Sequence, residues 1–295
     1  MIQAFKEMFS FSKLNTFSCC PRKYWYRYIL GRRESSAAQI YGRAVHFGQE
    51  VDCYNKLEGR RLPRATILDA AVDKLKEEAD KERVRPDTDT FVKEHERQLE
   101  VFEESGERDR INPVAGTVEA PFEMRVSVGN PETGEKEAEA TIQGFVDVVS
   151  QNPRTGEKTI VDYKTAVKPV YPKMADDNLQ FGLYILGAPA DSLKVVNFVK
   201  SGKQKPTTKV TRPTVMSEPR RTKLMTWLSD TIKSVRRAIR TGDWPRCSPT
   251  CHWCSPNACD FHGLCYPDKD TDLPKLIQIE EIRPVGTVER PAWRK

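Results

Sequence analysis

The stretch IQGFVDVVSQNPRTGEKTIVDYKT, residues 142–165, places acidic side chains inside what otherwise reads as an apolar β-hairpin. Two runs rich in β-branched and aromatic residues, 145–149 and 159–163, have the composition of strands. Between them lies the segment NPRTG, in which Pro153 and Gly156 are turn-forming residues. The stretch therefore predicts two antiparallel strands joined by a short turn.

The hairpin also predicts a site for a cation. If the strands are symmetric about the turn, Asp147 faces Asp162 directly, and Lys164 lies on the same face two positions further on. Opposed residues have Cβ atoms about 4.5–5.5 Å apart, and like charges placed there destabilise a sheet. A hard divalent cation such as Mg²⁺ held between the two carboxylates relieves this repulsion. The alternative is a solvated strand end at Asp147, with Lys164 as its ion-pair partner.

The composition is that of a polar globular protein of 295 residues, with 38% hydrophobic and 31% charged residues. No apolar run approaches the roughly 18 residues of a membrane span, and MIQAFKEMFSFSK lacks the apolar core of a signal peptide. We therefore expect a cytoplasmic protein, where eight cysteines indicate metal or redox chemistry. Residues 212–246 hold nine Lys or Arg against three Asp or Glu, which equals the whole net charge of +6 and suits a polyanion.

The secondary-structure pattern mixes helices and strands without an internal repeat. His95 falls on the apolar stripe of a helix and is expected to be a core or boundary residue. A turn is expected at 130–134. Helices are expected at 12–18, 21–30, 37–55, around 67–79 and 92–102, 174–187 and 217–240, and strands at 117–128, 137–150, 159–163 and 193–199.

The last of these helices is basic and amphipathic. Its apolar stripe is expected to be buried, and Arg236 and Arg237 lie on the opposite, exposed face. Such arginines either contact DNA or form an ordinary solvated face. The residues expected to be buried are Leu224, Leu228, Ile232, Val235 and Ile239.

Two further motifs add polar residues. GRAVHFG places His46 in the third helix behind Gly42, whose small size permits close approach. NLQFGLY places Gln180 and Tyr184 at positions i and i+4, on one face of the helix that follows the Asp162 strand.

In this order, GxxxH, GxxD, a DxK strand and QxxxY resemble the nuclease domain of the RecB-type PD-(D/E)XK superfamily. The opening SFSKLNTFSCCPRKYWYRYI is similar to the first helices of its iron–sulfur branch, which includes AddB and CRISPR-adaptation nucleases. The resemblance covers about residues 10–60 and 115–265, and no helicase motif is present. It implies a restriction-endonuclease-like α/β (α+β) fold, with a central mixed sheet flanked by helices.

The resemblance also implies roles for the motif residues. His46, Asp147 and Asp162 would bind catalytic Mg²⁺ or Mn²⁺, and Lys164 would orient the attacking water. Gln180 and Tyr184 would support the substrate or the metal ligands. Glu119 falls on the preceding strand, but its register is too loose to assign it as a ligand.

In the iron–sulfur branch, a cysteine near the start joins three near the C-terminus around a [4Fe–4S] cluster, which here implies Cys20. The segment RCSPTCHWCSPNACDFHGLCYP offers five cysteines for three places, and the family's final spacing favours Cys259 and Cys265. The preceding family cysteine would fall at Pro256, so Cys254 is nearest and Cys251 is its rival. This leaves Cys19, Cys53 and Cys247 as dispensable.

Four thiolates also suit a structural zinc, and the nearby His252 and His262 keep zinc open. The division of the ligands between Cys20 and the C-terminus favours iron. In either case, ligation would join the two ends of the chain.

The leading hypothesis is a metal-dependent DNA exonuclease acting in recombination, repair or phage DNA processing, in a bacterial or phage-infected cell. Single-stranded DNA or duplex ends are its expected substrates, with a recombination protein or a second copy as a candidate partner. The alternatives are an endonuclease of restriction or CRISPR-adaptation type and a non-catalytic, zinc-stapled nucleic-acid-binding protein. The expected parts are N-terminal helices (1–62), a helical insert (63–112), the nuclease core with the basic helix (113–246), a cysteine-rich segment (247–272) and a tail (273–295).

Overall fold

The computed structural model describes residues 8–32, 36–129, 136–202, 205–248, 250–251, 253–256 and 258–266. It has the expected α/β composition, with mixed sheets flanked by helices. The chain divides into two compact units, one of residues 1–34, 125–142 and 225–295, the other of residues 35–124 and 143–224. We call them the first and the second unit. The turn expected at 130–134, His252 and the tail from 273 lie outside the described residues.

The second unit is built on a mixed sheet in the order β4–β5–β6–β7. Strands β4 (Val148–Gln151) and β5 (Lys158–Ala166) are antiparallel, and Val148 pairs with Val161 as the symmetric hairpin predicts. Strand β6 (Ser192–Val199) is parallel to β5, so the chain crosses over through α6 (Pro172–Asp177) and α7 (Leu179–Gly187). Strands β7 (Thr207–Val210) and β8 (Thr214–Val215) both pair antiparallel with β6.

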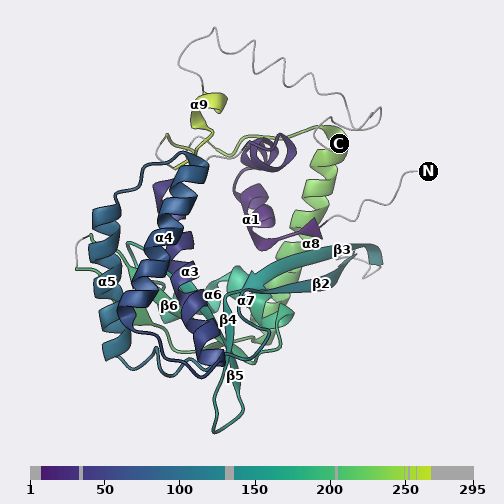
Figure 1. Ribbon diagram of the computed structural model, residues 1–295. Coiled ribbons are helices and arrows are strands. Elements are labelled where there is room, and N and C mark those ends of the chain that lie inside the picture. The colour runs from purple at the N-terminus through teal and green to yellow at the C-terminus, as the bar shows by residue number, and fades with distance from the viewer. Residues whose placement is uncertain are drawn as a thin grey trace. The chain divides into compact units, whose positions relative to one another are not determined.

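Helices α3 (Ala37–Leu57) and α5 (Thr88–Glu104) pack on this sheet, and α4 (Arg64–Glu82) packs against both of them (Figure 1). Helix α3 begins with a capping box at Ser36, which satisfies otherwise unpaired backbone N–H groups. A Cβ at Gly48 would lie 3.1 Å from the carbonyl oxygen of Ile67, so this glycine allows α3 and α4 to pack closely. The core between helices and strands includes Ile40, Ala44, Val45, Ile67, Ala71, Leu75, Phe91, Phe102, Val148, Val161, Tyr163, Val196 and Phe198.

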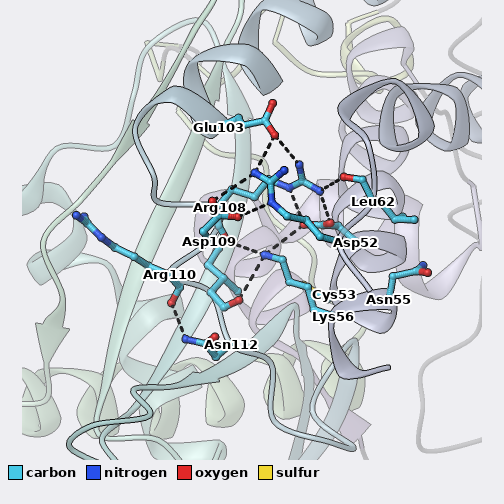
Figure 2. A network of polar contacts seen from close by, with 12 residues as sticks. Asp52, Cys53, Asn55, Lys56, Leu62, Glu103, Arg108, Asp109, Arg110 and Asn112 are labelled. Atoms are coloured by element: carbon cyan, nitrogen blue, oxygen red, sulfur yellow. Dashed lines mark hydrogen bonds and ion pairs between the residues drawn. The ribbon is translucent and has the colours of Figure 1, made fainter. Parts of the chain in front are cut away.

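The segment predicted as a helical insert, residues 63–112, is joined to α3 by a polar network centred on the buried Arg108 (Figure 2). Arg108 is 2% exposed and donates to Asp52 through Nε at 3.1 Å and through Nη2 at 2.6 Å. Its remaining hydrogen bonds reach Glu103 and the carbonyl oxygen of Leu62. Lys56 also pairs with Asp52, at 3.3 Å. The guanidinium is thus fully paired, as a buried charge requires.

The first unit joins both ends of the described chain. Its N-terminal part consists of β1 (Met8–Phe9), α1 (Phe11–Cys19), α2 (Pro21–Tyr24) and the π-helical turn η1 (Trp25–Ile29). Strand β1 pairs parallel with β3 (Lys136–Val146), which neighbours β2 (Ala120–Gly129). The ring of Phe11 lies against Trp227 in helix α8 (Glu218–Thr241), and α9 (His262–Cys265) ends the described chain.

Several predicted boundaries were wrong, each for a local reason. The strand predicted at 137–150 is interrupted at Asp147, which forms a bend between β3 and β4. The helix predicted at 174–187 is two helices, because the Asn178 side chain accepts hydrogen bonds from Gln180 and Phe181 and caps α7. The helix predicted at 21–30 widens into η1 after Tyr24. Among the described helices, none is both long and apolar enough to span a membrane.

Candidate active site

The two predicted carboxylates meet in the second unit, although not as a simple opposed pair. Asp147 lies one position beyond the pair of Val148 and Val161, at the bend that ends β3. Its Oδ2 accepts a 2.6 Å hydrogen bond from the backbone N–H of Tyr163, the residue after Asp162. The bend thus turns the Asp147 carboxylate onto β5, beside Asp162. The predicted symmetry of the hairpin holds for the paired residues of β4 and β5 and ends at this bend.

Helix α3 brings His46 to the same place. Its Nδ1 lies 3.5 Å from Asp147 Oδ1. Gly42, one turn earlier, allows this approach because a Cβ there would lie 3.2 Å from the Thr165 hydroxyl on β5. The prediction that Gly42 permits close approach is confirmed.

Glu119 completes the group, although the sequence did not allow its assignment. Ligand atoms of His46, Glu119 and Asp147 all lie within 4.8 Å of one another. Glu119 directly precedes β2, and its N–H donates to the carbonyl oxygen of Asp147 at 2.8 Å. Its φ of 47° is in the left-handed region, which non-glycine residues seldom adopt.

Asp162 and Lys164 form the other half of the site. Lys164 Nζ lies 2.8 Å from Asp162 Oδ1, as their shared strand face predicts. Asp162 is 1% exposed, and its Oδ2 has no hydrogen-bond partner among the described residues. A buried carboxylate oxygen without a partner costs free energy unless a ligand satisfies it.

The electrostatics separate the two aspartates. Burial, opposed by the Lys164 ammonium, raises the pKa of Asp162 to about 6, and the charge of Asp147 adds to the rise. Burial would also raise the pKa of Asp147, but the charge and hydrogen bond of His46, with Lys164, hold it below its usual value. The pKa of Glu119 is raised to about 7 by burial and by Asp147. The raised pKa values show that Asp162 and Glu119 lose a proton less readily in the metal-free site than Asp147 does.

These residues fit a divalent cation. Carboxylate oxygens are the ligands that Mg²⁺ prefers, and a histidine nitrogen beside them also suits Mn²⁺. The unpartnered Asp162 Oδ2 and the closely placed donors of His46, Glu119 and Asp147 provide ligand atoms without breaking a described hydrogen bond of the core.

Gln180 and Tyr184 also meet, on α7. Gln180 Nε2 donates to the Tyr184 hydroxyl at 2.8 Å, which confirms their shared helix face. Burial, opposed by the charge of Lys164, raises the pKa of Tyr184 to about 12, so its hydroxyl stays protonated at neutral pH. The Tyr184 ring packs edge-on against Phe122, at 5.9 Å between centroids.

The position of Phe122 explains the glycine of the GxxD motif. A Cβ at Gly144 would lie 2.6 Å from the Phe122 ring, and one at Gly187 would lie 2.4 Å from it. Both distances are too short for any side chain. Phe122 therefore fills the space that these two glycines leave, and supports Tyr184 from behind.

The cysteines gather in the first unit, in a cavity of about 190 Å³. Cys20 and the C-terminal cysteines line it together, as the division between chain ends predicts. Cys251 is not among the lining residues, whereas its rival Cys254 is. Cys247, which the sequence left as dispensable, also lines the cavity. The cysteines that line it are Cys19, Cys20, Cys247, Cys254, Cys259 and Cys265.

These thiols fit a metal centre of the soft-ligand type, because cysteine sulfurs bind iron–sulfur clusters and zinc. The thiol of Cys247 interacts with those of Cys20 and Cys254, and burial with these neighbours raises its pKa. Bound metal would favour the thiolates and so offset this rise. His262 also lines the cavity, which keeps zinc chemically open.

Protein contacts already join the ends of the first unit around this cavity. The backbone N–H of Arg22 donates to Pro245 at 3.1 Å, and the Tyr26 ring stacks on Phe261 at 5.3 Å. Lys23 pairs with Asp260 at 3.9 Å. A hydrogen bond, a ring contact and an ion pair therefore hold the two segments together around the cavity, in addition to any ligation by the thiols.

The arginines of α8 differ from one another. Arg237 is exposed, as predicted, but Arg236 is only half-exposed, and its Nη2 donates to the carbonyl oxygen of Glu139 on β3 at 2.7 Å. Arg236 was expected to face solvent, and this bond to a strand explains the difference. Leu224, Leu228, Ile232 and Val235 are buried as predicted, and Ile239 is half-buried.

The family model of the PD-(D/E)XK nuclease superfamily matches residues 8–266, and the chain belongs to this superfamily. Membership implies that the protein is a nuclease, with DNA as its substrate and a divalent metal in its active site. No curated protein matches the chain.

Two solved structures are similar over most of the chain. One is described as a "putative exonuclease" from Eubacterium rectale, with 15% identity, a TM-score of 0.48, and 85% of this chain and 88% of that chain covered. The other is SSO0001, with 13% identity, a TM-score of 0.37 and 79% of each chain covered.

Proposed function

We propose that the protein is a metal-dependent DNA exonuclease that carries a [4Fe–4S] cluster and acts in recombination, repair or phage DNA processing. The observation that supports this most is the convergence of His46 and Asp147 with the Asp162–Lys164 pair in one unit. A non-catalytic DNA-binding protein would have no need of an unpartnered buried carboxylate oxygen beside a lysine.

The proposed reaction is in-line attack of water on a phosphodiester. Mg²⁺ or Mn²⁺ held by His46, Asp147 and Asp162 would supply an activated water nucleophile and offset negative charge on the phosphate. Lys164, whose pKa is raised by Asp162 and Asp147 against the effect of burial, stays charged. It can therefore orient the water and pair with a phosphate oxygen throughout the reaction.

Gln180 and Tyr184 are proposed to contact the substrate or to hold the ligands. Their mutual hydrogen bond leaves the second amide hydrogen of Gln180 for another acceptor. Arg236 and Arg237 of α8 are proposed to contact DNA phosphates, Arg237 more strongly because Arg236 already binds a strand carbonyl.

The proposed cluster ligands are Cys20, Cys254, Cys259 and Cys265. All four line one cavity, and Cys20 comes from the opposite end of the chain to the other three. A cluster held in this way would fix the first helices to the C-terminal segment. We place the protein in the cytoplasm of a bacterium or a phage-infected cell, where such clusters are assembled.

One assay tests the proposed activity. Purified protein is incubated with end-labelled single-stranded and duplex DNA, and with a closed circular DNA, in Mn²⁺ or EDTA. We expect degradation from the ends that requires the metal and spares the circle. Cleavage of the circle would indicate the endonuclease alternative, and binding without any cleavage would indicate the non-catalytic one.

A further inference from the structure

The segment that joins strand β5 to helix α6 exposes several large apolar side chains. Residues 167–174 have the sequence VKPVYPKM and follow directly on the strand that carries Lys164. Val167, Tyr171 and Met174 are each 55–56% exposed. Large apolar side chains gathered on a surface commonly mark a binding site. The reaction proposed above uses none of them.

A buried side chain holds this segment over the face of the sheet that carries the candidate active site. Asn197 of β6 is 2% exposed, and its Oδ1 accepts a 2.8 Å hydrogen bond from the backbone N–H of Val170. Its amide nitrogen donates to the carbonyl oxygen of Lys209 on β7, which fixes the orientation of the side chain. Asn197 is also the partner of Lys164 in the pairing of β5 with β6. Adjacent strands lie about 4.8 Å apart, so the segment is anchored beside the proposed catalytic lysine.

The same segment carries positive charge. Lys168 and Lys173 are exposed, and neither forms an ion pair with another of the described residues. The nearby Asp176 of α6 pairs with Arg212 instead. Lysines interleaved with exposed aromatic and apolar side chains suit single-stranded nucleic acid, because bases stack on the rings while the lysines attract the phosphates.

A hollow of about 420 Å³ lies at the α6 end of the segment, lined by Val170, Lys173, Met174, Asp177 and Asn178. Its apolar side chains suit the flat face of a nucleobase. The Asp177 carboxylate would repel a phosphate, but it can accept a hydrogen bond from the amino group of a base. The bases of a duplex are paired and stacked on one another, so this surface fits bases of a single strand.

We propose that residues 167–174 bind the single-stranded part of the DNA substrate beside the scissile phosphate. The Tyr171 ring stacks on a base, and Lys168 and Lys173 pair with phosphates of the same strand. This inference deepens the proposed function and rests on the DNA substrate assigned there. It implies that a single strand, or an unpaired duplex end, is the form of DNA that reaches Lys164.

The test is the affinity of the full chain for a fluorescein-labelled oligothymidylate, measured by fluorescence anisotropy in EDTA so that no cleavage occurs. Tyr171→Ala should weaken binding about five- to 150-fold, the range expected for one lost base stack, whereas Tyr171→Trp should retain it. The salt dependence of binding by Tyr171→Ala should equal that of the native protein, because a stacking contact releases no counterions. Lys168→Ala and Lys173→Ala should each flatten the log–log slope by about 0.7.

Tyr54→Ala is the matched control. Tyr54 is also an exposed tyrosine of the second unit, but it belongs to α3. That helix packs on the face of the sheet that carries Val161 and Tyr163, opposite to the face of Lys164. The control should bind the oligothymidylate as the native protein does. Tyr171→Ala should also bind a blunt-ended duplex with native affinity.

A loss in Tyr171→Ala no larger than the loss in Tyr54→Ala would overturn the inference, and so would an equal loss for the blunt duplex. Analytical ultracentrifugation tests the other occupant, a second copy of the chain. If Tyr171→Ala dissociates an oligomer and keeps native DNA affinity, the segment is a contact between copies and the inference is wrong. Binding through Tyr171 by a native protein that never cleaves DNA in Mn²⁺ would refute the proposed function alone. Metal-dependent cleavage by a native protein whose affinity does not depend on Tyr171 would refute this inference alone.

Discussion

The Asp147 carboxylate accepts a hydrogen bond from the backbone N–H of Tyr163, so it is joined to the strand that carries Asp162. The two aspartates are therefore unequal in the metal-free protein. Asp147 has partners in Tyr163 and His46, whereas one oxygen of Asp162 has none among the described residues. Substitution of either aspartate should abolish cleavage, but the two substitutions should change the free energy of unfolding differently.

We expect Asp147→Ala, Asp162→Ala and Lys164→Ala each to abolish cleavage. In EDTA, Asp147→Ala should lower the free energy of unfolding by about 1–3 kcal/mol, because it leaves a buried N–H without an acceptor. Asp162→Ala should leave it unchanged or raise it, since the pKa of Asp162 is raised by burial. Urea unfolding with EDTA measures both. Full activity in Lys164→Ala would contradict the proposed role of the lysine.

His95 predicts how stability depends on pH. It is fully buried, and burial lowers its pKa to about 4, although the hydrogen bond with Gln98 opposes this. The unfolded chain therefore binds a proton more readily, and this contribution is present above pH 6.5 and is lost as the pH falls toward 4. The contribution at neutral pH is on the order of 3 kcal/mol.

The measurement is urea unfolding between pH 4 and 8 for the native protein and His95→Gln. The variant should lose this component of the pH dependence above pH 4, because glutamine does not titrate. Equal slopes in both proteins would show that other groups determine the acid sensitivity.

The network of Figure 2 predicts a large loss on removing one partner. Arg108→Met leaves the buried carboxylate of Asp52 without its main partner, and such changes typically cost about 3–5 kcal/mol. Asp52→Leu combined with Arg108→Met should recover most of the loss, since two apolar side chains replace the pair. Urea unfolding measures the free energy of unfolding of each single variant and of the double variant, which together form a double-mutant cycle. Additive losses would show that the pair is not coupled.

The arginines of α8 predict a difference in salt dependence. Each phosphate contact on single-stranded DNA contributes about 0.7 to the log–log slope of affinity against salt. Arg237→Ala should flatten the slope by about this amount, and Arg236→Ala by less, because Arg236 binds the Glu139 carbonyl. Fluorescence anisotropy in EDTA measures this without cleavage. An unchanged slope for both variants would assign them to a solvated face.

The cysteines that line the cavity predict that the purified protein is coloured by an iron–sulfur cluster. Anaerobically purified protein should be brown, with visible absorption that bleaches on reduction. Cys20→Ser and Cys254→Ser should lose the colour and unfold at a lower temperature, because metal ligation contributes folding free energy. Cys251→Ser is the control and should keep both, since Cys251 does not line the cavity. A colourless protein with stoichiometric zinc would contradict iron.

Cys247 gives this experiment a second comparison. The sequence predicts that it is dispensable, yet it lines the cavity and contacts the thiols of Cys20 and Cys254. If Cys247→Ser loses the colour and Cys254→Ser keeps it, the ligand assignment from sequence spacing is wrong.

Much of the catalytic half could be predicted because local patterns determine it. Alternation along β5 placed Asp162 and Lys164 on one face, and the turn residues set the pairing of Val148 with Val161. The sequence did not identify Glu119 as a site residue, because its position depends on a positive φ and on a hydrogen bond to Asp147. The alternation of residues along a strand reveals neither of these. The sequence signal that could have indicated Glu119 is an acidic residue at the start of an apolar strand.

The remaining misses also depended on contacts distant in sequence. Arg236 binds a carbonyl of β3, which no helical periodicity could indicate. Asn178 is of a residue type that commonly caps a helix N-terminus, but the apolar residues on both sides of it favoured the prediction of one continuous helix. The five-part division of the chain stays a prediction.

Helix α3 carries both His46 and, nearly two turns later, Asp52 with its buried partner Arg108. Anyone shortening this chain to a minimal enzyme would choose residues 63–112 for deletion, because they contain no catalytic candidate. The deletion would remove Arg108 and expose the apolar face of α3, the same helix that carries His46. Residues 63–112 thus support the helix that carries His46, the proposed metal ligand, and a truncated version needs a redesigned α3 before it can be expected to fold.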